Sequence, residues 1–389
     1  MANRVAMLSW ESMHSIPVGG LAAHVTELAG ALQRRGDEVH VFTRMGEGQP
    51  RYSCIGGVHY HRCPFDPNAD FMTYVGRMGD ALFERLRAAE DFYGQPFDVV
   101  HGHDWLAVPA LGRVKRELGR PVTFTMHSTE YGRCGNELRE GTARTIRDME
   151  WYGTYVADRV ICVSRVLAEE VQRIYSTPSD KLSVVYNGVD PSRFDGDVDV
   201  EAVRRSVGVG GGDPLVLFVG RLTWQKGPDL LMGAVPEVQR HRADAKFVFV
   251  GDGDMRSALE GQAGAAGLFN SVRFLGTRNG SDLVGLFKSA DVVCVPSRNE
   301  PFGIVVLEAW SATRPVVVTC NGGPREFVRD QETGWLVEPN RQSLGWALGT
   351  ALADTANADR IGTNGRQEAE TRFSWDAIAE EMDSVYELV

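Results

Sequence analysis

Short runs of apolar residues alternate with longer stretches of helical periodicity along almost the whole chain. Residues 21–34 and 142–155 are two such stretches, with apolar positions recurring every three or four residues. Strand and helix repeated in this way predict parallel sheets joined by right-handed crossovers. The strands predicted in the first half of the chain are residues 5–9, 38–43, 58–62, 98–101, 122–126, 159–163 and 182–185.

The alternation pauses over residues 190–214, where Gly and Asp predict a linker with one short helix. We therefore predict an α/β protein with two Rossmann-like, doubly wound parallel-sheet domains, at residues 1–187 and 188–372. The C-terminal helix, in residues 373–389, is expected to cross back to the first domain. Because open α/β sheets bind ligands beyond the carboxyl ends of their strands, we expect the domains to face each other across a cleft. The strands predicted in the second half are residues 215–219, 246–250, 272–275, 291–295 and 315–319.

Composition narrows the classes of partner. The net charge of −11 over 389 residues argues against a nucleic-acid partner, which needs a basic surface, and gives no strong sign of membrane binding. No apolar run reaches the roughly 18 residues that a membrane span needs, and no charged-then-apolar leader opens the chain. The six cysteines form no Cys-x-x-Cys pair. We expect a cytoplasmic protein with reduced thiols, and its oligomeric state stays open.

Two carboxylates, Glu300 and Glu308, flank the point where the strand at 291–295 gives way to a helix. A helix N-terminus offers free N–H groups and a positive dipole end, which suit a phosphate. Carboxylates accept hydrogen bonds from hydroxyls, so a sugar on one side of that phosphate and a ribose on the other would fit. The competing interpretation is two ordinary helix charges.

Two further loops each follow the first strand of a predicted domain. Gly19 and Gly20 open the helix after the strand at 5–9, so their backbone can approach a ligand closely, although a plain tight turn also explains them. Arg221 and Lys226 are the only cations of the loop after the strand at 215–219. Two fixed cations would stabilise a diphosphate leaving group electrostatically, in place of a metal. The alternative is an exposed loop with solvated charges.

The combined motifs resemble the retaining, nucleotide-sugar-dependent glycosyltransferases of family four and the related glycogen and starch synthases. The resemblance covers nearly the whole chain and implies the GT-B fold. Pro17 stands where bacterial glycogen synthases have a lysine, which favours the broader family pattern. The motifs are Gly19-Gly20, His101-Gly102-His103-Asp104-Trp105, Thr125-Met126-His127, Tyr186-Asn187-Gly188-Val189-Asp190, Gly220-Arg221-Leu222 with Lys226-Gly227, Gly251-Asp252-Gly253, and Glu300 with Glu308.

The resemblance implies roles for individual residues. His127 would lie beside the anomeric carbon of the donor sugar, and Asp104 would orient hydroxyl groups, unless it is simply a helix N-cap. Glu300 would hold the sugar hydroxyls and Glu308 the ribose. Gly19 and Gly20 would lie over the diphosphate and donor sugar. The remaining donor-binding candidates contribute main-chain groups: Phe302, Gly303, Ile304 and Val305 near the phosphate and sugar, and Gly276 and Thr277 near the base.

No metal or cofactor is predicted. Asp252 and Asp254 form an Asp-x-Asp, but they lie between a strand and a helix, where turn and N-cap chemistry explains both. We expect a retaining, metal-independent transfer of a hexose, glucose first, from ADP- or UDP-glucose to a carbohydrate acceptor, with an α-glucan as first choice. A small sugar, sugar phosphate or lipid acceptor remains open. So do a sugar-nucleotide epimerase, a glycan phosphorylase and a non-catalytic nucleotide-sugar sensor.

Overall fold

The computed structural model describes residues 2–389, and the chain divides into two compact units. Unit 1 contains the residues up to Gly188 together with Trp375–Val389, and unit 2 contains Val189–Ser374. The sequence-based division at residues 187 and 372 differs from this by one and two residues.

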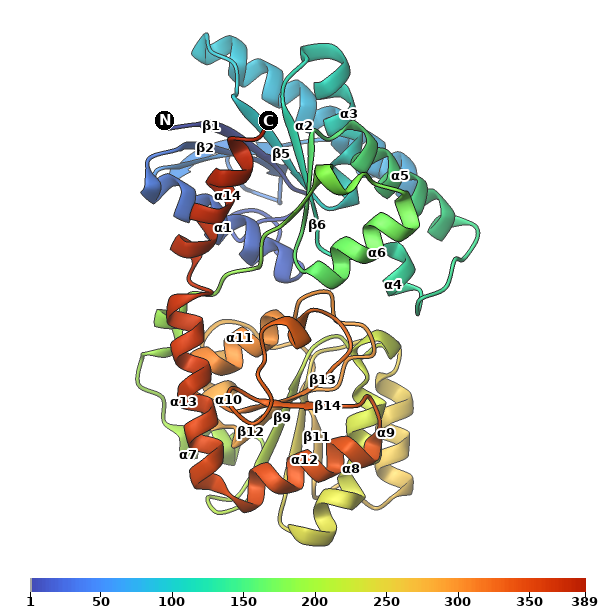
Figure 1. Cartoon of the computed structure of the whole chain (residues 1–389), viewed down its shortest axis with the longest axis vertical. Coiled ribbons are helices and arrows are strands. Elements are labelled where there is room, and N and C mark those ends of the chain that lie inside the picture. Colours follow the sequence, from blue (N-terminus) through green and yellow to red (C-terminus); the bar gives the residue numbers. More distant parts are fainter. Residues whose placement is uncertain (1) are drawn as a thin grey trace. The chain divides into compact units, whose positions relative to one another are not determined.

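Unit 1 is built on an eight-stranded sheet with the order β3-β4-β2-β1-β5-β6-β7-β8 (Figure 1). Every neighbouring pair is parallel except β3 and β4, which are antiparallel. The predicted parallel sheet is thus extended at this edge by one antiparallel strand. The strands are β1 (Arg4–Leu8), β2 (Glu38–Arg44), β3 (Tyr52–Ile55), β4 (Val58–Cys63), β5 (Val99–His103), β6 (Val122–Met126), β7 (Arg159–Cys162) and β8 (Leu182–Val184).

The helices of unit 1 include one from the far end of the chain. α14 (Trp375–Tyr386) packs against α1 (Gly20–Arg35), with Ile378 and Met382 in the same apolar cluster as Leu28. Ion pairs of Arg34 with Asp376 and Arg35 with Asp383 join the same two helices. The other helices are α2 (Phe71–Tyr93), α3 (Val108–Arg113), α4 (Glu130–Arg133), α5 (Thr142–Val156) and α6 (Arg165–Tyr175).

Unit 2 has a six-stranded sheet, parallel throughout, with the order β11-β10-β9-β12-β13-β14. Its strands are β9 (Leu215–Val219), β10 (Lys246–Val250), β11 (Val272–Phe274), β12 (Val292–Val295), β13 (Val316–Thr319) and β14 (Trp335–Val337). The helices are α7 (Val200–Ser206), α8 (Pro228–His241), α9 (Arg256–Ala265), α10 (Gly280–Ser289), α11 (Ile304–Ser311), α12 (Arg341–Ala353) and α13 (Thr355–Thr371).

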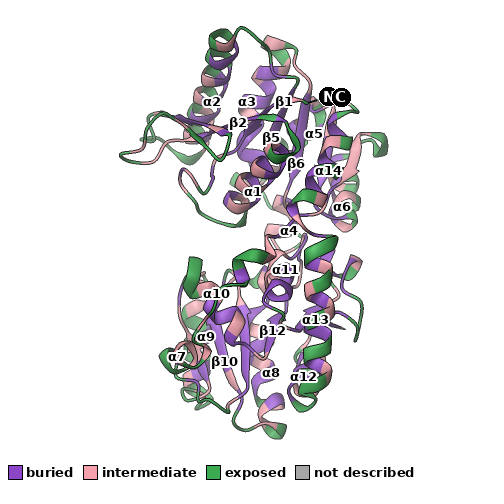
Figure 2. Cartoon of the chain, turned by 90° about the vertical axis from the view of Figure 1, so that its left-hand side faces the viewer, coloured by how far each residue is buried: buried purple, intermediate pink, exposed green. Residues whose placement is uncertain are grey.

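The central strands are buried in both units, as Figure 2 shows. A parallel strand covered by helices on both faces is apolar throughout, which is why the runs at β9, β12 and β13 could be recognised. All the predicted strands are present. β3 and β14 were not predicted, and β3 is an exposed edge strand without a clear apolar pattern.

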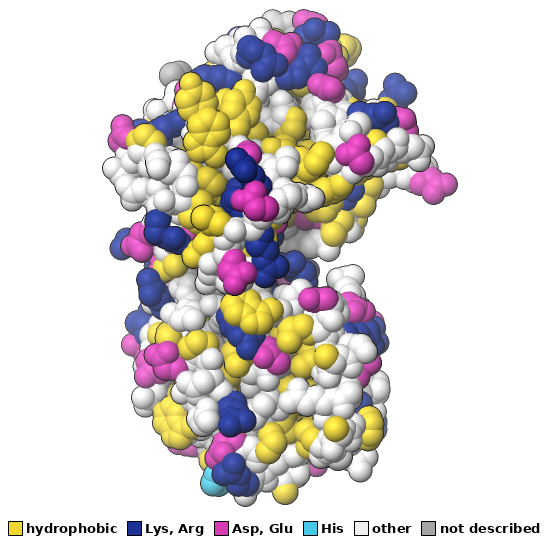
Figure 3. Space-filling model, turned by 90° about the vertical axis from the view of Figure 1, so that its right-hand side faces the viewer, with side chains coloured by type: hydrophobic (Ala, Val, Ile, Leu, Met, Phe, Trp, Pro, Cys, Tyr) yellow, Lys and Arg dark blue, Asp and Glu magenta, His cyan; other side chains and the backbone are white. Residues whose placement is uncertain are grey.

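The surface has no strong segregation of charge on the face drawn in Figure 3, where acidic and basic side chains are interspersed. Within residues 2–389, no helix is both long enough and apolar enough to cross a bilayer.

Candidate active site

The strand order places one ligand-binding edge in unit 2. From β9 the chain continues to β10 and β11 on one side of the sheet, and β12, β13 and β14 lie on the other side of β9. The direction in which strands are added therefore reverses between β9 and β12. Loops that follow the two strands at such a switch point diverge and leave a crevice at the carboxyl edge. The loop after β9 contains Arg221 and Lys226, and the loop after β12 contains Glu300.

Lys226 and Glu300 meet at this edge, although 74 residues separate them. The Lys226 ammonium donates to both carboxylate oxygens of Glu300, at 2.9 and 2.8 Å. The Ser297 hydroxyl donates to Glu300 as well, at 2.8 Å. The Glu300 side chain is 8% exposed and that of Lys226 is 23% exposed. A cation and a carboxylate are thus fixed side by side before any ligand arrives.

The N-terminus of α11 comes shortly after Glu300 in the chain. Gly303, with φ of 103°, caps the helix, and the N–H groups of Ile304 and Val305 lie in its first turn, where the helix has no acceptor for them. Glu308 lies about one turn further along. Burial raises the pKa of Glu308 to about 7, against the opposing positive charge of Arg193.

The other donor-site candidates lie on the same edge or close to it. Arg221 is exposed and its guanidinium donates to Gln225 at 3.2 Å. Gly276 and Thr277 follow β11, and the Gly276 carbonyl accepts the amide of Gly251. Phe302 is 2% exposed and packs on Phe327, so only its main chain is available to a ligand.

Asp252 is held by its neighbours in the turn before α9. Its carboxylate accepts the Gly253 amide at 2.8 Å and pairs with Arg256 at 2.8 Å. Among residues 2–389, the groups of three or more possible metal ligands include neither Asp252 nor Asp254. These contacts match the turn interpretation for Asp252, but the N-cap interpretation is wrong, because Met255 caps α9 and no side-chain capping bond is made there.

We predict that Gly322→Ala disturbs the donor edge. A Cβ atom on Gly322 would lie 2.0 Å from the Glu300 carbonyl oxygen, and its φ of 107° is strained for any L residue. We expect a loss of roughly 2 kcal/mol or more in unfolding free energy, measured by denaturant titration. Gly349→Ala in α12 is the control, because the added Cβ atom meets open space. This substitution should raise the free energy of unfolding by about 0.5–1 kcal/mol. Equal stability of the Gly322 variant and the wild type would contradict the prediction.

In unit 1 the strand order reverses between β1 and β5, so the loops after these strands diverge and leave a crevice at this carboxyl edge. The Gly19–Gly20 turn lies after β1 and is held by a residue that the sequence analysis did not identify. Glu11, 2% exposed, accepts the amides of Val18 and Gly19 at 2.6 and 3.0 Å. Burial raises the pKa of Glu11, and these two amides oppose the shift. The turn is therefore anchored through its backbone.

Asp104 and His127 directly follow the adjacent parallel strands β5 and β6. Asp104 has φ of 62°, a conformation that is uncommon outside glycine, and makes no side-chain capping bond to the short helix after it. Its Oδ1 is buried without a partner among the described residues. Burial raises its pKa, and Arg133 opposes that rise. These observations argue against a simple N-cap role for Asp104.

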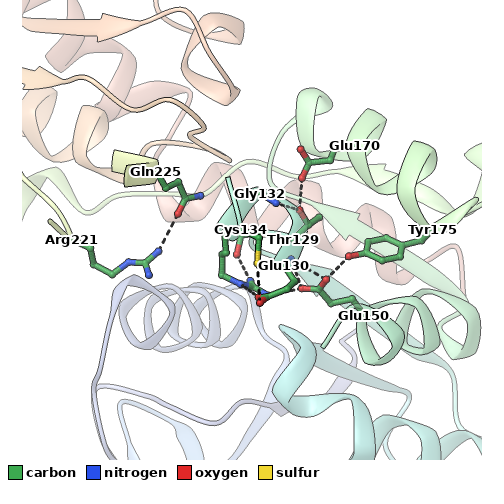
Figure 4. Close-up of polar contacts among 11 residues, drawn as sticks. Thr129, Glu130, Gly132, Cys134, Glu150, Glu170, Tyr175, Arg221 and Gln225 are labelled. Carbon is green, nitrogen blue, oxygen red and sulfur yellow. Dashed lines mark hydrogen bonds and ion pairs between the residues drawn. The ribbon is translucent and has the colours of Figure 1, made fainter. Parts of the chain in front are cut away.

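A buried polar network lies next to this edge (Figure 4). Glu150 of α5 is fully buried, accepts the amide of Glu130 at 2.9 and 3.0 Å, and pairs with Arg133 at 2.6 Å. Tyr175 also donates to it. Burial raises the pKa of Glu150 to about 7, although Arg133 opposes this. The network fixes α4, which begins three residues after His127.

We predict that this network makes stability depend on pH. A carboxyl group whose pKa is raised on folding contributes to the free energy of unfolding. This contribution is fully present below the pKa of the unfolded chain, near 4.3, and it is lost as the pH rises through the folded-state pKa of about 7. The free energy of unfolding of Glu150→Gln should therefore rise relative to that of the wild type by about 1–3 kcal/mol between pH 5 and pH 8. This change with pH is expected whether the variant is more or less stable than the wild type at pH 5. Unfolding curves across this range measure the difference. Exposed Glu84→Gln is the control, and parallel profiles for Glu150→Gln and the wild type would contradict the prediction.

Comparison with known proteins identifies the chain. Residues 18–193 match the model for "Glycosyltransferase Family 4" and residues 199–368 match that for "Glycosyl transferases group 1". An uncharacterized glycosyltransferase of Methanocaldococcus jannaschii is 40% identical over 99% of this chain and 98% of its own. The chain belongs to glycosyltransferase family 4. Its two parallel-sheet domains are those of the GT-B fold, as predicted.

Other relatives of this glycosyltransferase have named activities. A glycogen synthase of Mycobacterium tuberculosis is 29% identical, over 98% of this chain and 94% of the relative. A D-inositol 3-phosphate glycosyltransferase of Xylanimonas cellulosilytica is 32% identical, over 98% and 96%. The predicted likeness to glycogen synthases is confirmed.

Two solved structures share the fold over nearly their whole length. A sucrose-phosphate synthase from Thermosynechococcus elongatus has a TM-score of 0.83 at 25% identity, covering 99% of this chain and 98% of that one. The catalytic domain of starch synthase IV from Arabidopsis thaliana, bound to ADP and acarbose, has a TM-score of 0.82 at 18% identity, covering 100% and 99%.

Proposed function

We propose that this glycosyltransferase moves a glucosyl unit from ADP- or UDP-glucose to a growing α-glucan, with retention of configuration and without a metal or cofactor. The observation that supports it most directly is the Lys226–Glu300 pair beside the N-terminus of α11. This edge combines a cation for a phosphate, helix N–H groups, and a carboxylate for sugar hydroxyls. The likeness to a glycogen synthase supports the glucan acceptor.

In the proposed reaction the bond between the anomeric carbon and the diphosphate oxygen breaks, and a bond to the acceptor oxygen forms on the same face of the sugar. The acceptor proton passes to the departing phosphate oxygen. Arg221 and Lys226 stabilise the negative charge that grows on the leaving group. Glu300 binds sugar hydroxyls, Asp104 orients hydroxyl groups, and His127 contacts the sugar.

A second candidate acceptor is a small phosphorylated polyol. The inositol phosphate glycosyltransferase relative, at 32% identity over nearly the whole chain, supports it as strongly as the glycogen synthase supports the glucan. The donor half of the site is the same for both acceptors.

One experiment separates these possibilities. Purified protein is incubated with ADP-, UDP- and GDP-glucose, each alone, with glycogen, or with inositol phosphate, while nucleoside diphosphate release and product are followed. Transfer to glycogen supports the proposal, and transfer only to inositol phosphate supports the second candidate. Epimerised donor without transfer, or binding without turnover, would overturn both.

We further predict that Glu308→Ala weakens nucleotide binding rather than chemistry. Its carboxylate is proposed to accept hydrogen bonds from the ribose, which are made equally in the ground and transition states. The dissociation constant of the nucleoside diphosphate, measured by calorimetry, should rise at least tenfold while kcat at saturating donor falls much less. Glu332→Ala, a surface residue paired with Arg329, is the control. Unchanged nucleotide affinity would contradict this role.

A further inference from the structure

The loop between β1 and α1 has a buried base and an exposed tip. Glu11, Ser12 and Ser15 in the base are buried, whereas residues 17–20 in the tip are exposed. The Ser15 hydroxyl lies 3.0 Å from that of Thr43 on β2, a contact that ties the base to the sheet. The tip has no such contact with the sheet of its own, so its conformation depends on what holds it to the base.

The carboxylate of Glu11 makes that connection. A single oxygen, Oε2, accepts two amides of the tip, from Val18 at 2.6 Å and from Gly19 at 3.0 Å. The main chain of Glu11 is fixed in turn by Ser9, whose hydroxyl donates to the Glu11 carbonyl at 2.8 Å and accepts the Glu11 amide at 3.3 Å. The Glu11 side chain therefore joins a fixed base to the tip.

A carboxylate in this position is held against a penalty. Glu11 is 2% exposed, and burial raises its pKa, while the amides of Gly19 and Val18 and the charge of Arg44 oppose the rise. A desolvated charge is tolerated only where hydrogen bonds or ion pairs offset the loss of water. In the absence of Glu11, water would satisfy the amides of an exposed turn. The carboxylate therefore contributes a fixed geometry to the turn more than it contributes stability.

The tip lies where a fixed geometry matters. It follows β1, at the crevice left by the reversal of strand order between β1 and β5. The amides of Val18 and Gly19 are engaged by Glu11, whereas those of Gly20 and Leu21 lie in the first turn of α1, where the helix has no acceptor for them. Glu11 thus determines which amides of the turn are free to meet a ligand in the crevice.

We propose that Glu11 is a positioning residue for transfer, which holds the Gly19–Gly20 turn in the conformation that meets the sugar and diphosphate of the donor. The effect on transfer rests on the proposed function, whereas the anchoring of the turn does not. Nucleotide binding is assigned to unit 2, so loss of Glu11 should lower kcat and leave nucleotide affinity unchanged. A displacement of about 1 Å in a group that positions the substrate can reduce the rate roughly a hundredfold.

Three substitutions of Glu11 separate the position of its acceptor oxygen from its charge. Glu11→Gln keeps an oxygen that can accept both amides, because both donate to the same atom, but it removes the charge. Glu11→Asp keeps the charge on a shorter side chain. At saturating donor, we expect kcat to fall roughly tenfold or more in Glu11→Asp and Glu11→Ala, and less than about fivefold in Glu11→Gln. The dissociation constant of the nucleoside diphosphate, measured by calorimetry, should stay within about twofold of the wild-type value in all three.

Glu90→Ala is the matched control. Glu90 is also a buried carboxylate, which accepts the main-chain amide of Phe97 at 2.8 Å and pairs with Arg120 at 3.0 Å. Phe97 comes before β5, at the opposite edge of the sheet. Glu90→Ala should lower the free energy of unfolding and leave kcat unchanged. Circular dichroism shows which variants fold, and the comparison of Glu11→Asp with Glu11→Gln is sufficient if Glu11→Ala does not fold.

Hydrogen exchange across residues 16–22, measured by mass spectrometry, reports the anchoring without turnover. We expect slow exchange in the wild type and in Glu11→Gln, and faster exchange in Glu11→Asp. If exchange follows this order but no transfer occurs under any condition, the anchoring stands and the proposed function fails. If transfer occurs and a folded Glu11→Asp variant keeps the wild-type kcat, or is more active than Glu11→Gln, the positioning role of Glu11 is wrong. Equal exchange in Glu11→Asp and the wild type would overturn the anchoring itself.

Discussion

Glu300→Ala is expected to lose most turnover while keeping its affinity for the nucleoside diphosphate. The carboxylate is proposed to bind the sugar, and hydrogen bonds that strengthen in the transition state are worth about 3 kcal/mol, or at least a hundredfold in rate. Alanine also leaves the Lys226 ammonium without its partner. Glu300→Gln retains the shape of the side chain and an acceptor for Ser297, so it separates the loss of charge from the loss of packing.

The measurements are kcat at saturating donor and nucleotide affinity by calorimetry, for both variants and for the Glu332→Ala control. A large fall in kcat with affinity preserved supports the assignment. The opposite division, with weak nucleotide binding and nearly normal kcat, would show that Glu300 and Glu308 have been assigned the wrong roles.

The fold was largely predictable because parallel strands covered on both faces leave a simple signal. Each appears as a short apolar run, and the helices between them show a different period. β3 gives no such signal, because most of its residues are exposed. The placement of the candidate residues at carboxyl edges followed from the same pattern, since they come directly after predicted strands.

The contacts within the site were not predictable in the same way. Lys226 and Glu300 meet because β9 and β12 are neighbours, and strand order is not visible in a single sequence. Glu11 lies in a loop where nothing distinguishes it from a solvated carboxylate. Glu150 did leave a signal, because it shares the buried face of α5 with Ile146 and Thr154, four residues to either side. A charged residue on an otherwise buried helix face indicates a buried polar partner.

Removal of Lys226 should be as damaging as removal of Glu300, for a different reason. Lys226→Ala takes away a cation aimed at the leaving group, and we expect kcat to fall roughly a hundredfold. Lys226→Arg keeps the charge but changes the geometry, and should retain part of the activity. Asp254→Ala should change kcat little, since charge stabilisation is assigned to Arg221 and Lys226 rather than to a metal held by the Asp-x-Asp motif.

Excess chelator tests whether the positive charge that stabilises the leaving group comes from Arg221 and Lys226 or from a bound metal ion. If the cations of the loop after β9 stabilise the leaving group, activity survives chelation. Loss of turnover on chelation, restored by Mg²⁺ or Mn²⁺, would show that a metal supplies the charge and would return Asp252 and Asp254 to the site. Because Asp252 is paired with Arg256, metal binding there would first have to break that ion pair. The combination of an inactive Lys226→Ala variant and a chelator-resistant wild type is therefore the result that assigns leaving-group stabilisation to this lysine.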